Sequence, residues 1–157
     1  MEYKKLKSLI TPKSSGIPRL KQVNQNIFRS GRPPVQDLEG LQKSKGIATI
    51  IDLENPALDK EKAEAERLGM KFISSPMNAN VEPSKAQIDS LMKDLTNPEN
   101  FPILVHCEFG RDRTGLIIGL YRVLVEKMDA GTAYKEMIDN GFRPFAPLVT
   151  AFKKYTS

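Results

Sequence analysis

Residues 106–115 read His106-Cys107-Glu108-Phe109-Gly110-Arg111-Asp112-Arg113-Thr114-Gly115, and they contain the only cysteine and the only histidine of the 157-residue chain. The apolar run 101–105 before them predicts a buried strand, and the apolar run 116–125 after them predicts a helix. A strand followed by a glycine-containing loop and a helix N-terminus concentrates backbone N–H groups on an anion. We therefore expect residues 106–115 to form a cradle for phosphate or sulfate.

Cys107 opens this loop. A helix N-terminus, unpaired N–H groups and the guanidinium groups of Arg111 and Arg113 would all stabilise its thiolate. Arg113 lies six residues after Cys107 and can offer two parallel N–H donors to the oxygens of a bound phosphoryl group. Cys107 would then attack phosphorus in line and form a phosphocysteine, which water hydrolyses in a second step. The hydroxyl of Thr114 would stabilise the departing thiolate in that step.

Two carboxylates are candidates for the proton donor that the leaving group needs. Asp112 lies in the loop beside Arg113, and we predict that it is the general acid and then the base that activates water. The alternative role for Asp112 is an N-terminal helix cap that complements the helix dipole. Glu82 is the second candidate acid, because it is the only carboxylate in segment 74–83. We expect the polar part of that segment, residues 76–83, to cover the substrate.

The other loop residues are assigned to phosphate binding or to its support. Arg111 can add a second contact to a polyphosphorylated substrate, or it can form a surface salt bridge. Glu108 and Phe109 shape the rim of the loop. The expected phosphate-binding set is Glu108, Phe109, Gly110, Arg111, Asp112 and Arg113, with His106 and Thr114 in supporting roles.

The loop HCEFGRDRTG resembles the signature loop of the cysteine-dependent protein tyrosine and dual-specificity phosphatases, whose pattern is His-Cys, five residues, Arg, then Ser or Thr. The upstream segment 27–33, Ile-Phe-Arg-Ser-Gly-Arg-Pro, is similar to a strand of the small atypical dual-specificity phosphatases. The similarity covers most of residues 27–143. It implies that Cys107 is the nucleophile and Arg113 the phosphate binder, and we expect neither a metal ion nor a cofactor.

The sequence departs from this family pattern at the general acid. Most members carry an aspartate on a separate loop about thirty residues ahead of the cysteine, whereas segment 74–83 has none. An aspartate just before the signature arginine is similar to the loops of myotubularin-like and Sac-like phosphoinositide phosphatases, and of certain secreted bacterial phosphatases with triple specificity. The favoured substrate is therefore a phosphoinositide or an inositol phosphate, ahead of phosphotyrosine.

Several other functions are compatible with a cysteine loop after a strand. A phosphotyrosine or dual-specificity protein phosphatase is the first alternative, and an RNA 5′-triphosphatase is a related one that the low aromatic content does not favour. A phosphate-recognition module without turnover is the non-enzymatic alternative, although a pure binder does not need the thiol of Cys107. Sulfur-transfer enzymes of the rhodanese type have a shorter loop without the Arg-Thr-Gly ending. The expected partner is thus a phosphorylated substrate, an inositol phosphate, a phosphoinositide or a phosphoprotein, and no nucleic acid.

The net charge of +5 is concentrated at the N-terminus. Residues 1–21 hold six Lys or Arg and a single Glu, so the rest of the chain is formally neutral. We expect residues 1–21 to form a basic, loosely ordered arm and residues 22–157 to form one phosphatase domain. The arm is either a solvated tail or a peripheral contact to an anionic membrane or polyphosphate. A single cysteine and the lack of any apolar run near ~20 residues predict a protein of the reducing cytoplasm.

Alternating strand and helix patterns predict an α/β domain with a mostly parallel central sheet flanked by helices, as in dual-specificity phosphatases. Asp52 follows an apolar strand, where it faces the phosphate site or caps a turn. The charges of segment 57–68 indicate a solvent-exposed helix face. The expected strands are a pair within 23–32, then 47–53, 70–74 and 101–105. The expected helices are 34–45, 57–68, 84–95, 114–127, 129–140 and a last one within 142–157.

Overall fold

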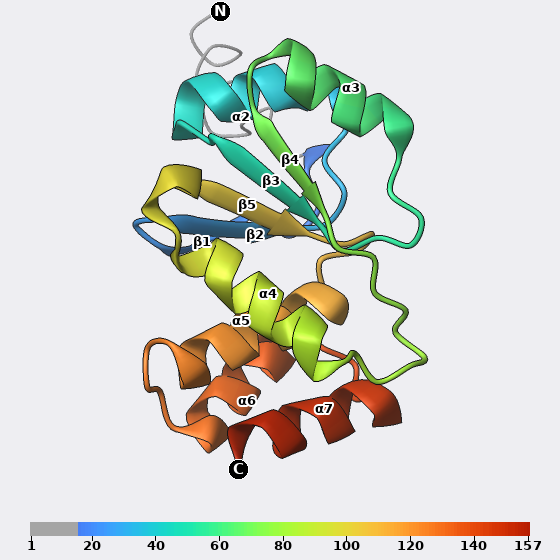
Figure 1. Ribbon diagram of the computed structural model, residues 1–157, viewed down its shortest axis with the longest axis vertical. Helices are drawn as coiled ribbons and strands as arrows, with labels where there is room; N and C mark the ends of the chain where they lie inside the picture. Colours follow the sequence, from blue (N-terminus) through green and yellow to red (C-terminus); the bar gives the residue numbers. More distant parts are fainter. Residues whose placement is uncertain (1–15) are drawn as a thin grey trace, which may run out of the picture.

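The computed structural model describes residues 16–157, which form a five-stranded sheet between two layers of helices (Figure 1). The strand order is β1-β2-β5-β3-β4, and every neighbouring pair is parallel except β1 and β2. The mostly parallel α/β fold predicted from the sequence is therefore confirmed. The strands are β1 Lys21–Asn24, β2 Ile27–Ser30, β3 Thr49–Asp52, β4 Lys71–Ser74 and β5 Ile103–His106.

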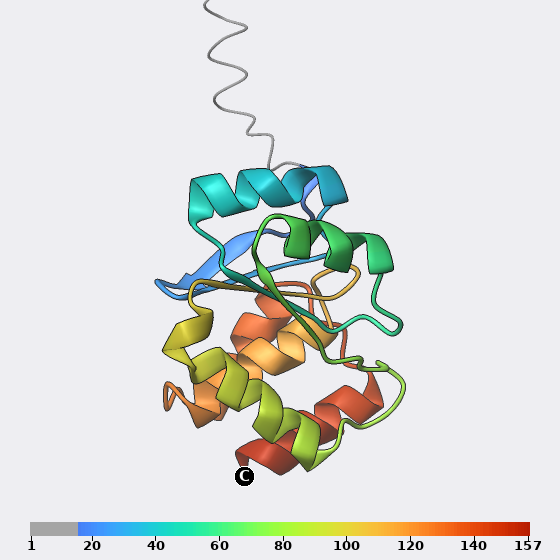
Figure 2. The same ribbon diagram turned by 45° about the horizontal axis from the view of Figure 1, so that its top comes forward.

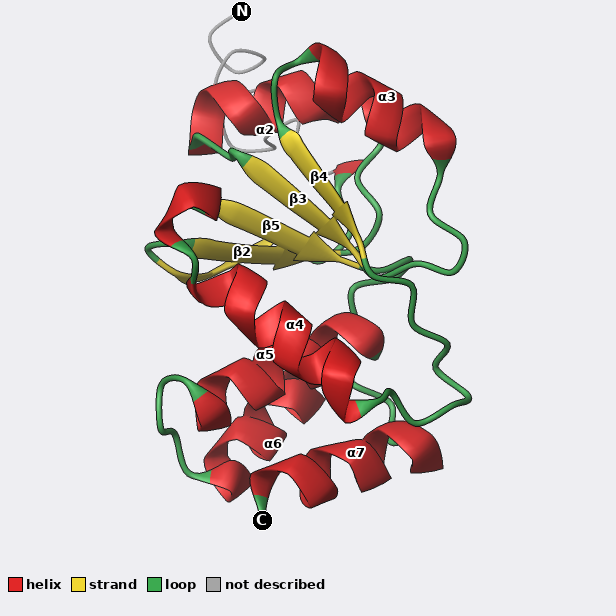
Figure 3. Ribbon diagram, viewed as in Figure 1, coloured by secondary structure: helices red, strands yellow, loops and turns green. Residues whose placement is uncertain are grey.

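The two helical layers differ in size, as the colouring by secondary structure makes plain (Figure 3). On one face of the sheet lie α2 and α3, and on the other lie α4 to α7 (Figure 2). The bounds are α2 Leu38–Lys45, α3 Asp59–Arg67, α4 Lys85–Thr96, α5 Arg113–Leu124, α6 Ala130–Asp139 and α7 Ala146–Thr156, with short 3-10 turns at Val35–Asp37 and Pro98–Asn100. None of the helices among residues 16–157 combines the length and the apolar character needed to cross a bilayer.

Strand side chains alternate between two apolar cores. Ile50 and Leu104 pack in the smaller core under α2 and α3, whereas Ile51 and Val105 pack in the larger core under α4 to α7. Central parallel strands are buried on both faces, which explains their continuous apolar sequence. Helix α5 is buried along residues 114–121 and forms the centre of the larger core.

The predicted helix signals are largely confirmed. Ser84 Oγ accepts a hydrogen bond from the N–H of Gln87 at 3.1 Å, and Asp129 Oδ2 accepts one from the N–H of Thr132 at 3.1 Å. The predicted capping box is only half formed, because the side-chain amide of Gln87 donates to Ser75 and Pro76 instead. Gln87 thus ties the start of α4 to the polar segment that precedes it.

The folded domain begins earlier than residue 22. Ile17 is buried in the smaller core, and the carbonyl of Pro18 accepts a hydrogen bond from the N–H of Gly31 at 2.7 Å. Residues 17–21 therefore belong to the domain and not to the predicted arm. The remainder of that arm, with its possible membrane contact, lies in residues 1–15, outside the described residues.

Candidate active site

The loop between β5 and α5 lies at the carboxyl end of the sheet, where parallel α/β sheets bind ligands. Cys107 follows the last residue of β5 and is 2% exposed. Gly110 adopts a φ of +74°, and α5 begins at Arg113. In the described part of the chain, no backbone N–H of residues 108–113 donates to a protein acceptor. These N–H groups and the helix N-terminus are therefore free to bind an anion, as the prediction of a phosphate cradle requires.

The end of β2 supports this loop from behind. The N–H of Arg32 donates to the carbonyl of Glu108 at 2.8 Å. The two backbones approach so closely at Gly31 and Gly110 that a Cβ on either glycine would lie within 3 Å of backbone atoms of the other segment. The segment that resembles the strand of atypical dual-specificity phosphatases therefore fixes the shape of the cradle.

Arg29 of β2 also holds the loop. Its side chain is nearly buried, and Nη2 donates to the carbonyl of Gly110 at 3.1 Å. Burial lowers the pKa of Arg29, and the charge of Cys107 acts in the opposite direction. Arg29 lies within the segment that carries the family resemblance. Its contact with Gly110 could not be predicted from the sequence, because the two residues are 81 positions apart.

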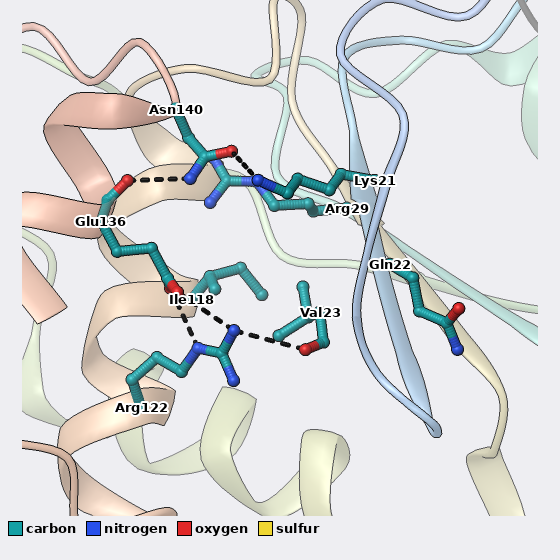
Figure 4. Close-up of a pocket in the computed structure, with 8 residues that line it drawn as sticks. All are labelled: Lys21, Gln22, Val23, Arg29, Ile118, Arg122, Glu136 and Asn140. Atoms are coloured by element: carbon teal, nitrogen blue, oxygen red, sulfur yellow. Dashed lines mark hydrogen bonds and ion pairs between the residues drawn. The ribbon is translucent and has the colours of Figure 1, made fainter.

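Arg29 faces a small cavity of about 20 Å³ at the edge of β1, which has room for roughly one water molecule (Figure 4). The cavity is bordered by an ion pair in which Arg122 Nε donates to Glu136 at 2.9 Å. Arg122 also donates to the carbonyl of Val23 at 3.3 Å and does not contact the loop. The lining residues are Lys21, Gln22, Val23, Arg29, Ile118, Arg122, Glu136 and Asn140.

Arg113 and Thr114 lie at the first turn of α5. Arg113 Nη1 donates to the carbonyl of Met77 at 3.2 Å, so the start of the polar segment 76–83 lies against the loop. Thr114 is fully buried, and its hydroxyl has no hydrogen-bond partner among residues 16–157. The role of this hydroxyl toward the sulfur of Cys107 stays a prediction.

Asp112 is held by an arginine that sequence reasoning did not identify. Its carboxylate accepts hydrogen bonds from Arg143 N at 2.8 Å, Nε at 3.0 Å and Nη2 at 2.6 Å. Asp112 occupies the predicted N-cap position of α5, where its charge lies at the positive end of the helix dipole, but its side chain makes no capping hydrogen bond. The carboxylate instead joins the loop to the connection between α6 and α7.

Glu82, the second candidate acid, is more accessible. Its side chain is about one third exposed, and Oε1 pairs with Lys154 of α7 at 3.1 Å. The side chain of Asp112, in contrast, is only 7% exposed. Asp112 is therefore buried, whereas Glu82 is partly exposed to solvent.

The rim of the loop combines an exposed aromatic ring with cations. Phe109 is 52% exposed, and Glu108 is also exposed. A Cβ on Gly141 would lie 3.1 Å from Arg19 Nη1 and 3.3 Å from Arg111 Cγ, so both arginines border this glycine. Neither Arg19 nor Arg111 forms an ion pair with a carboxylate of residues 16–157. Arg111 is thus not engaged in the surface salt bridge that was its alternative role.

His106 lies under the loop at the centre of a buried ionic cluster. Its Nε2 is 2.5 Å from Glu61 Oε2, and its Nδ1 is 3.1 Å from the carbonyl of Cys107. Asp52 Oδ1 and Glu54 Oε1 each lie 3.8 Å from Nδ1. All four side chains are at most 4% exposed. Asp52 accordingly faces the inner side of the site.

The charges and burial of this cluster shift the pKa values of His106 and Asp52. Burial alone would lower the pKa of His106, but the hydrogen bond and charge of Glu61, followed by the charge of Asp52, raise it to about 9. Burial raises the pKa of Asp52 to about 6, although the charge of His106 opposes this. The charges of Glu61 and Asp52 thus favour the protonated form of His106.

Sequence reasoning missed Glu61, because segment 57–68 has the charge density of an exposed helix. Glu61 and Ala65 are the buried residues of α3. Their spacing of four marks one helix face and was the only available signal.

The four residues also have the composition of a metal site, since one ligand atom from each lies within 4.8 Å of the others. However, the short contact between His106 Nε2 and Glu61 leaves no space for an ion between these two atoms. The imidazolium is the cation around which the carboxylates are arranged.

A buried cysteine in an anion-binding loop, between a parallel strand and a helix that starts with arginine, defines the architecture of a cysteine-dependent phosphatase. The model of the tyrosine phosphatase family matches residues 17–139. The chain belongs to this family, which confirms the resemblance seen in the sequence.

Curated relatives include proteins with two kinds of name. The dual specificity protein phosphatase TpbA of Pseudomonas aeruginosa is 28% identical over 124 residues, which are 78% of this chain and 55% of TpbA. The inositol diphosphatase SIW14 of Saccharomyces cerevisiae is 30% identical over 103 residues, which are 62% of this chain and 37% of SIW14. The chain therefore spans about half the length of TpbA and less of SIW14.

Solved structures share the fold. The crystal structure of TpbA aligns with a TM-score of 0.75 at 23% identity and covers 87% of this chain and 84% of that one. The core catalytic domain of the PP-IP phosphatase SIW14, in complex with citrate, aligns with a TM-score of 0.78 at 23% identity and covers 88% and 85%. At this level of identity the structures establish the arrangement of helices and strands.

Proposed function

We propose that the protein hydrolyses phosphate monoesters through a phosphocysteine on Cys107. The observation that carries this proposal is the loop itself, in which the N–H groups of residues 108–113 have no protein acceptor and surround a buried thiol. Such a site binds the three equatorial oxygens of a phosphoryl group and presents phosphorus to the sulfur. The guanidinium of Arg113 exchanges the carbonyl of Met77 for the phosphoryl oxygens when substrate binds.

The reaction has two displacement steps. In the first, Cys107 Sγ forms a bond to phosphorus, the ester P–O bond breaks, and the leaving oxygen takes a proton from a general acid. In the second, water loses a proton to a general base and attacks phosphorus, and the P–S bond breaks to return the thiolate. The unpaired hydroxyl of Thr114 donates to the sulfur as negative charge develops there.

The contacts of Asp112 and Glu82 favour different roles for these two residues in proton transfer. Both carboxylate oxygens of Asp112 accept hydrogen bonds from Arg143, so this group is less free than Glu82 to reach the leaving oxygen in the first step. Glu82 has a single exposed lysine partner and lies on the segment whose Met77 contacts Arg113. Asp112 remains our prediction for a role in proton transfer, and Glu82 is its rival for the first step.

The substrate class that we propose is an inositol phosphate or a phosphoinositide. Arg19 and Arg111 border Gly141 beside the loop, where they add positive charge for further phosphate groups of a polyphosphorylated ligand. The relative SIW14, and the relatives named inositol diphosphatase DSP2 and DSP4 in rice and Arabidopsis thaliana, support this assignment.

A protein phosphatase is the second candidate, favoured by one observation on this chain. Phe109 exposes half of its ring at the rim, where it can pack against the ring of a phosphotyrosine. TpbA, whose crystal structure has also been solved in complex with pTyr, supports this alternative.

Phosphate release from a matched panel of inositol polyphosphates, phosphoinositide vesicles and phosphotyrosyl peptides tests these assignments. We expect the inositol compounds to be hydrolysed fastest, and Cys107→Ser to abolish turnover while phosphate-analogue binding remains measurable. A clear preference for the peptides would reverse the substrate ranking. Turnover by Cys107→Ser would refute the nucleophile. Binding of phosphate without any turnover by the unaltered protein would identify a recognition module.

A further inference from the structure

Among the carboxylates of the buried cluster, only Glu61 has His106 as its single hydrogen-bond partner within residues 16–157. Asp52 Oδ1 accepts the N–H of Glu54 at 2.8 Å, and Glu54 Oε2 accepts Arg32 Nε at 2.8 Å. Glu61 Oε2 contacts only His106 Nε2, and its other oxygen has no partner within residues 16–157. A buried charge with one partner depends on that partner for its stability.

The two ring nitrogens of His106 point to different acceptors. A carbonyl oxygen can only accept a hydrogen bond, so the contact of Nδ1 with the Cys107 carbonyl places a proton on Nδ1. A carboxylate likewise accepts from Nε2. With Glu61 ionised, both nitrogens carry protons, and the ring is then a cation that joins α3 to the backbone of the nucleophile.

We propose that Glu61 is a positioning residue for Cys107, which acts through His106: the buried carboxylate keeps the imidazole protonated and oriented, so that a hydrogen bond to the Cys107 carbonyl and a positive charge are held beside the nucleophile. This inference rests on the proposed function, because it assigns a role in preparing the same nucleophile. It gives helix α3, which does not contribute to the loop, a defined part in the site.

The positions of the two charges relative to Cys107 determine whether the Glu61–His106 pair favours the thiolate or the thiol. Glu61 and the imidazolium are neutral as a pair, but the positive member contacts Cys107 and the negative member is one ring further away. The dipole of the pair therefore favours the thiolate. Without the carboxylate, the pKa of His106 loses its largest raising contribution and burial lowers it, although the charge of Asp52 still acts to raise it; the Nδ1–H would still bind the carbonyl.

Other charged groups face the same region and would remain in place. Asp52 and Glu54 face the ring from β3 and the residues after it, and Arg32 pairs with Glu54. Arg29 acts on Cys107 from β2, and Arg143 acts on it from the connection after α6. The change caused by a variant of Glu61 is thus a difference against a constant background.

The composition of the chain makes the experiment direct, because it contains one histidine and one cysteine. The ¹⁵N spectrum of the imidazole reports His106 alone, and the pH profile of alkylation by iodoacetamide reports Cys107 alone. In the unaltered protein we expect both ring nitrogens to be protonated at pH 7.5. A neutral ring at this pH would overturn the proposal.

Glu61→Gln keeps the shape of the side chain and removes its charge. We expect the midpoint of the alkylation profile to rise by about one pH unit, and kcat/KM for p-nitrophenyl phosphate below that midpoint to fall about tenfold. KM should change little. Glu66→Gln, on the exposed side of the same helix, is the matched control and should leave both profiles unchanged. A folded Glu61→Gln variant with the original midpoint would show that Glu61 is only structural.

If Glu61→Gln does not fold, the variant Glu61→Asp tests the role of the carboxylate instead. It retains the charge, so its alkylation midpoint should stay within about 0.3 pH units of the original. An alkylation midpoint raised by about a full pH unit in Glu61→Asp would overturn the proposal. The proposal would also be overturned if stoichiometric Zn²⁺ or Mn²⁺ changed the ¹⁵N signal of His106 to that of a metal-bound imidazole. The spectrum and the alkylation need no substrate, so they test Glu61 separately from the proposed phosphatase activity.

Discussion

The carboxylate of Asp112 is clamped by Arg143, which contributes its backbone N–H and two guanidinium N–H groups over a separation of 31 residues. Arg143 also lies over the ring of Phe145, with its Cζ 5.3 Å from the ring centre. This clamp connects the start of α5 to the segment before α7. A residue expected to move protons is therefore also part of what holds the loop in place.

Replacing the two candidate acids separately should identify the proton donor. A group that protonates the leaving oxygen matters for alkyl phosphates and little for p-nitrophenyl phosphate, whose leaving group needs no proton. From the contacts we expect Glu82→Gln to reduce alkyl phosphate turnover at least tenfold more than nitrophenyl turnover, and Asp112→Asn to reduce both alike. Initial rates on both esters measure this.

The control for loss of the clamp is Arg143→Met, which removes the guanidinium and retains Asp112. Loop distortion predicts parallel losses on both esters for Arg143→Met and Asp112→Asn. If Asp112→Asn instead affected the alkyl ester selectively and Glu82→Gln did not, Asp112 would be the general acid despite its arginine partner.

The sequence predicted the features that depend on local pattern. The strand, loop and helix around Cys107 and the caps at Ser84 and Asp129 follow from residue types at short spacing, and the structure confirms them. Such signals are local because the groups they satisfy lie within four residues of one another.

The contacts that tune the site could not be predicted in this way. Glu61 and His106 are 45 residues apart, and Arg29 and Gly110 are 81 apart. Nothing in the neighbours of a glutamate in a charged helix distinguishes a buried ion pair from an exposed one. Only the placement of α3 beside the sheet, which brings Glu61 to His106 at the end of β5, makes that distinction.

Arg29 and Arg122 line the same cavity, yet their replacement should have opposite consequences. Arg29→Met removes the donor to the Gly110 carbonyl, so we expect kcat/KM on p-nitrophenyl phosphate to fall about tenfold or more, because the cradle loses its fixed shape. Arg122→Met breaks ion pairs with Glu126 and Glu136 but touches no loop residue, so it should lower the thermal midpoint with kcat unchanged. Equal activities in the two variants would contradict the support that we assign to Arg29.

Gly110 and Gly46 have nearly the same positive φ and should respond differently to alanine. Gly46, at +71°, has open space around the missing Cβ, so Gly46→Ala should cost about 1 kcal/mol in the free energy of unfolding and leave activity intact. At Gly110 a Cβ would lie 2.5 Å from the N of Gly31, so Gly110→Ala must displace the loop and should abolish most turnover. Urea unfolding and nitrophenyl phosphate rates separate the two effects. An active Gly110→Ala variant would mean that the cradle does not need this close approach.

Stability should decline as pH rises, in two ranges. The pKa of Asp52 is raised to about 6 in the folded protein, so its contribution is present below its unfolded pKa of ~3.9 and is lost as pH rises through 6. The pKa of His106 is raised to about 9, so its contribution is complete below ~6.5 and is lost as pH rises through 9.

Thermal unfolding at pH 6.5, 8 and 9.5 tests the His106 range. We expect the midpoint of the unaltered protein to fall by about 5 °C or more across this range, because the native state must release a proton that it binds more tightly than the unfolded chain does. Glu61→Gln removes the main cause of the raised pKa, so its midpoint should begin lower and depend less on pH. If the two proteins lost stability in parallel between pH 6.5 and 9.5, groups other than the Glu61–His106 pair would be responsible for the alkaline decline.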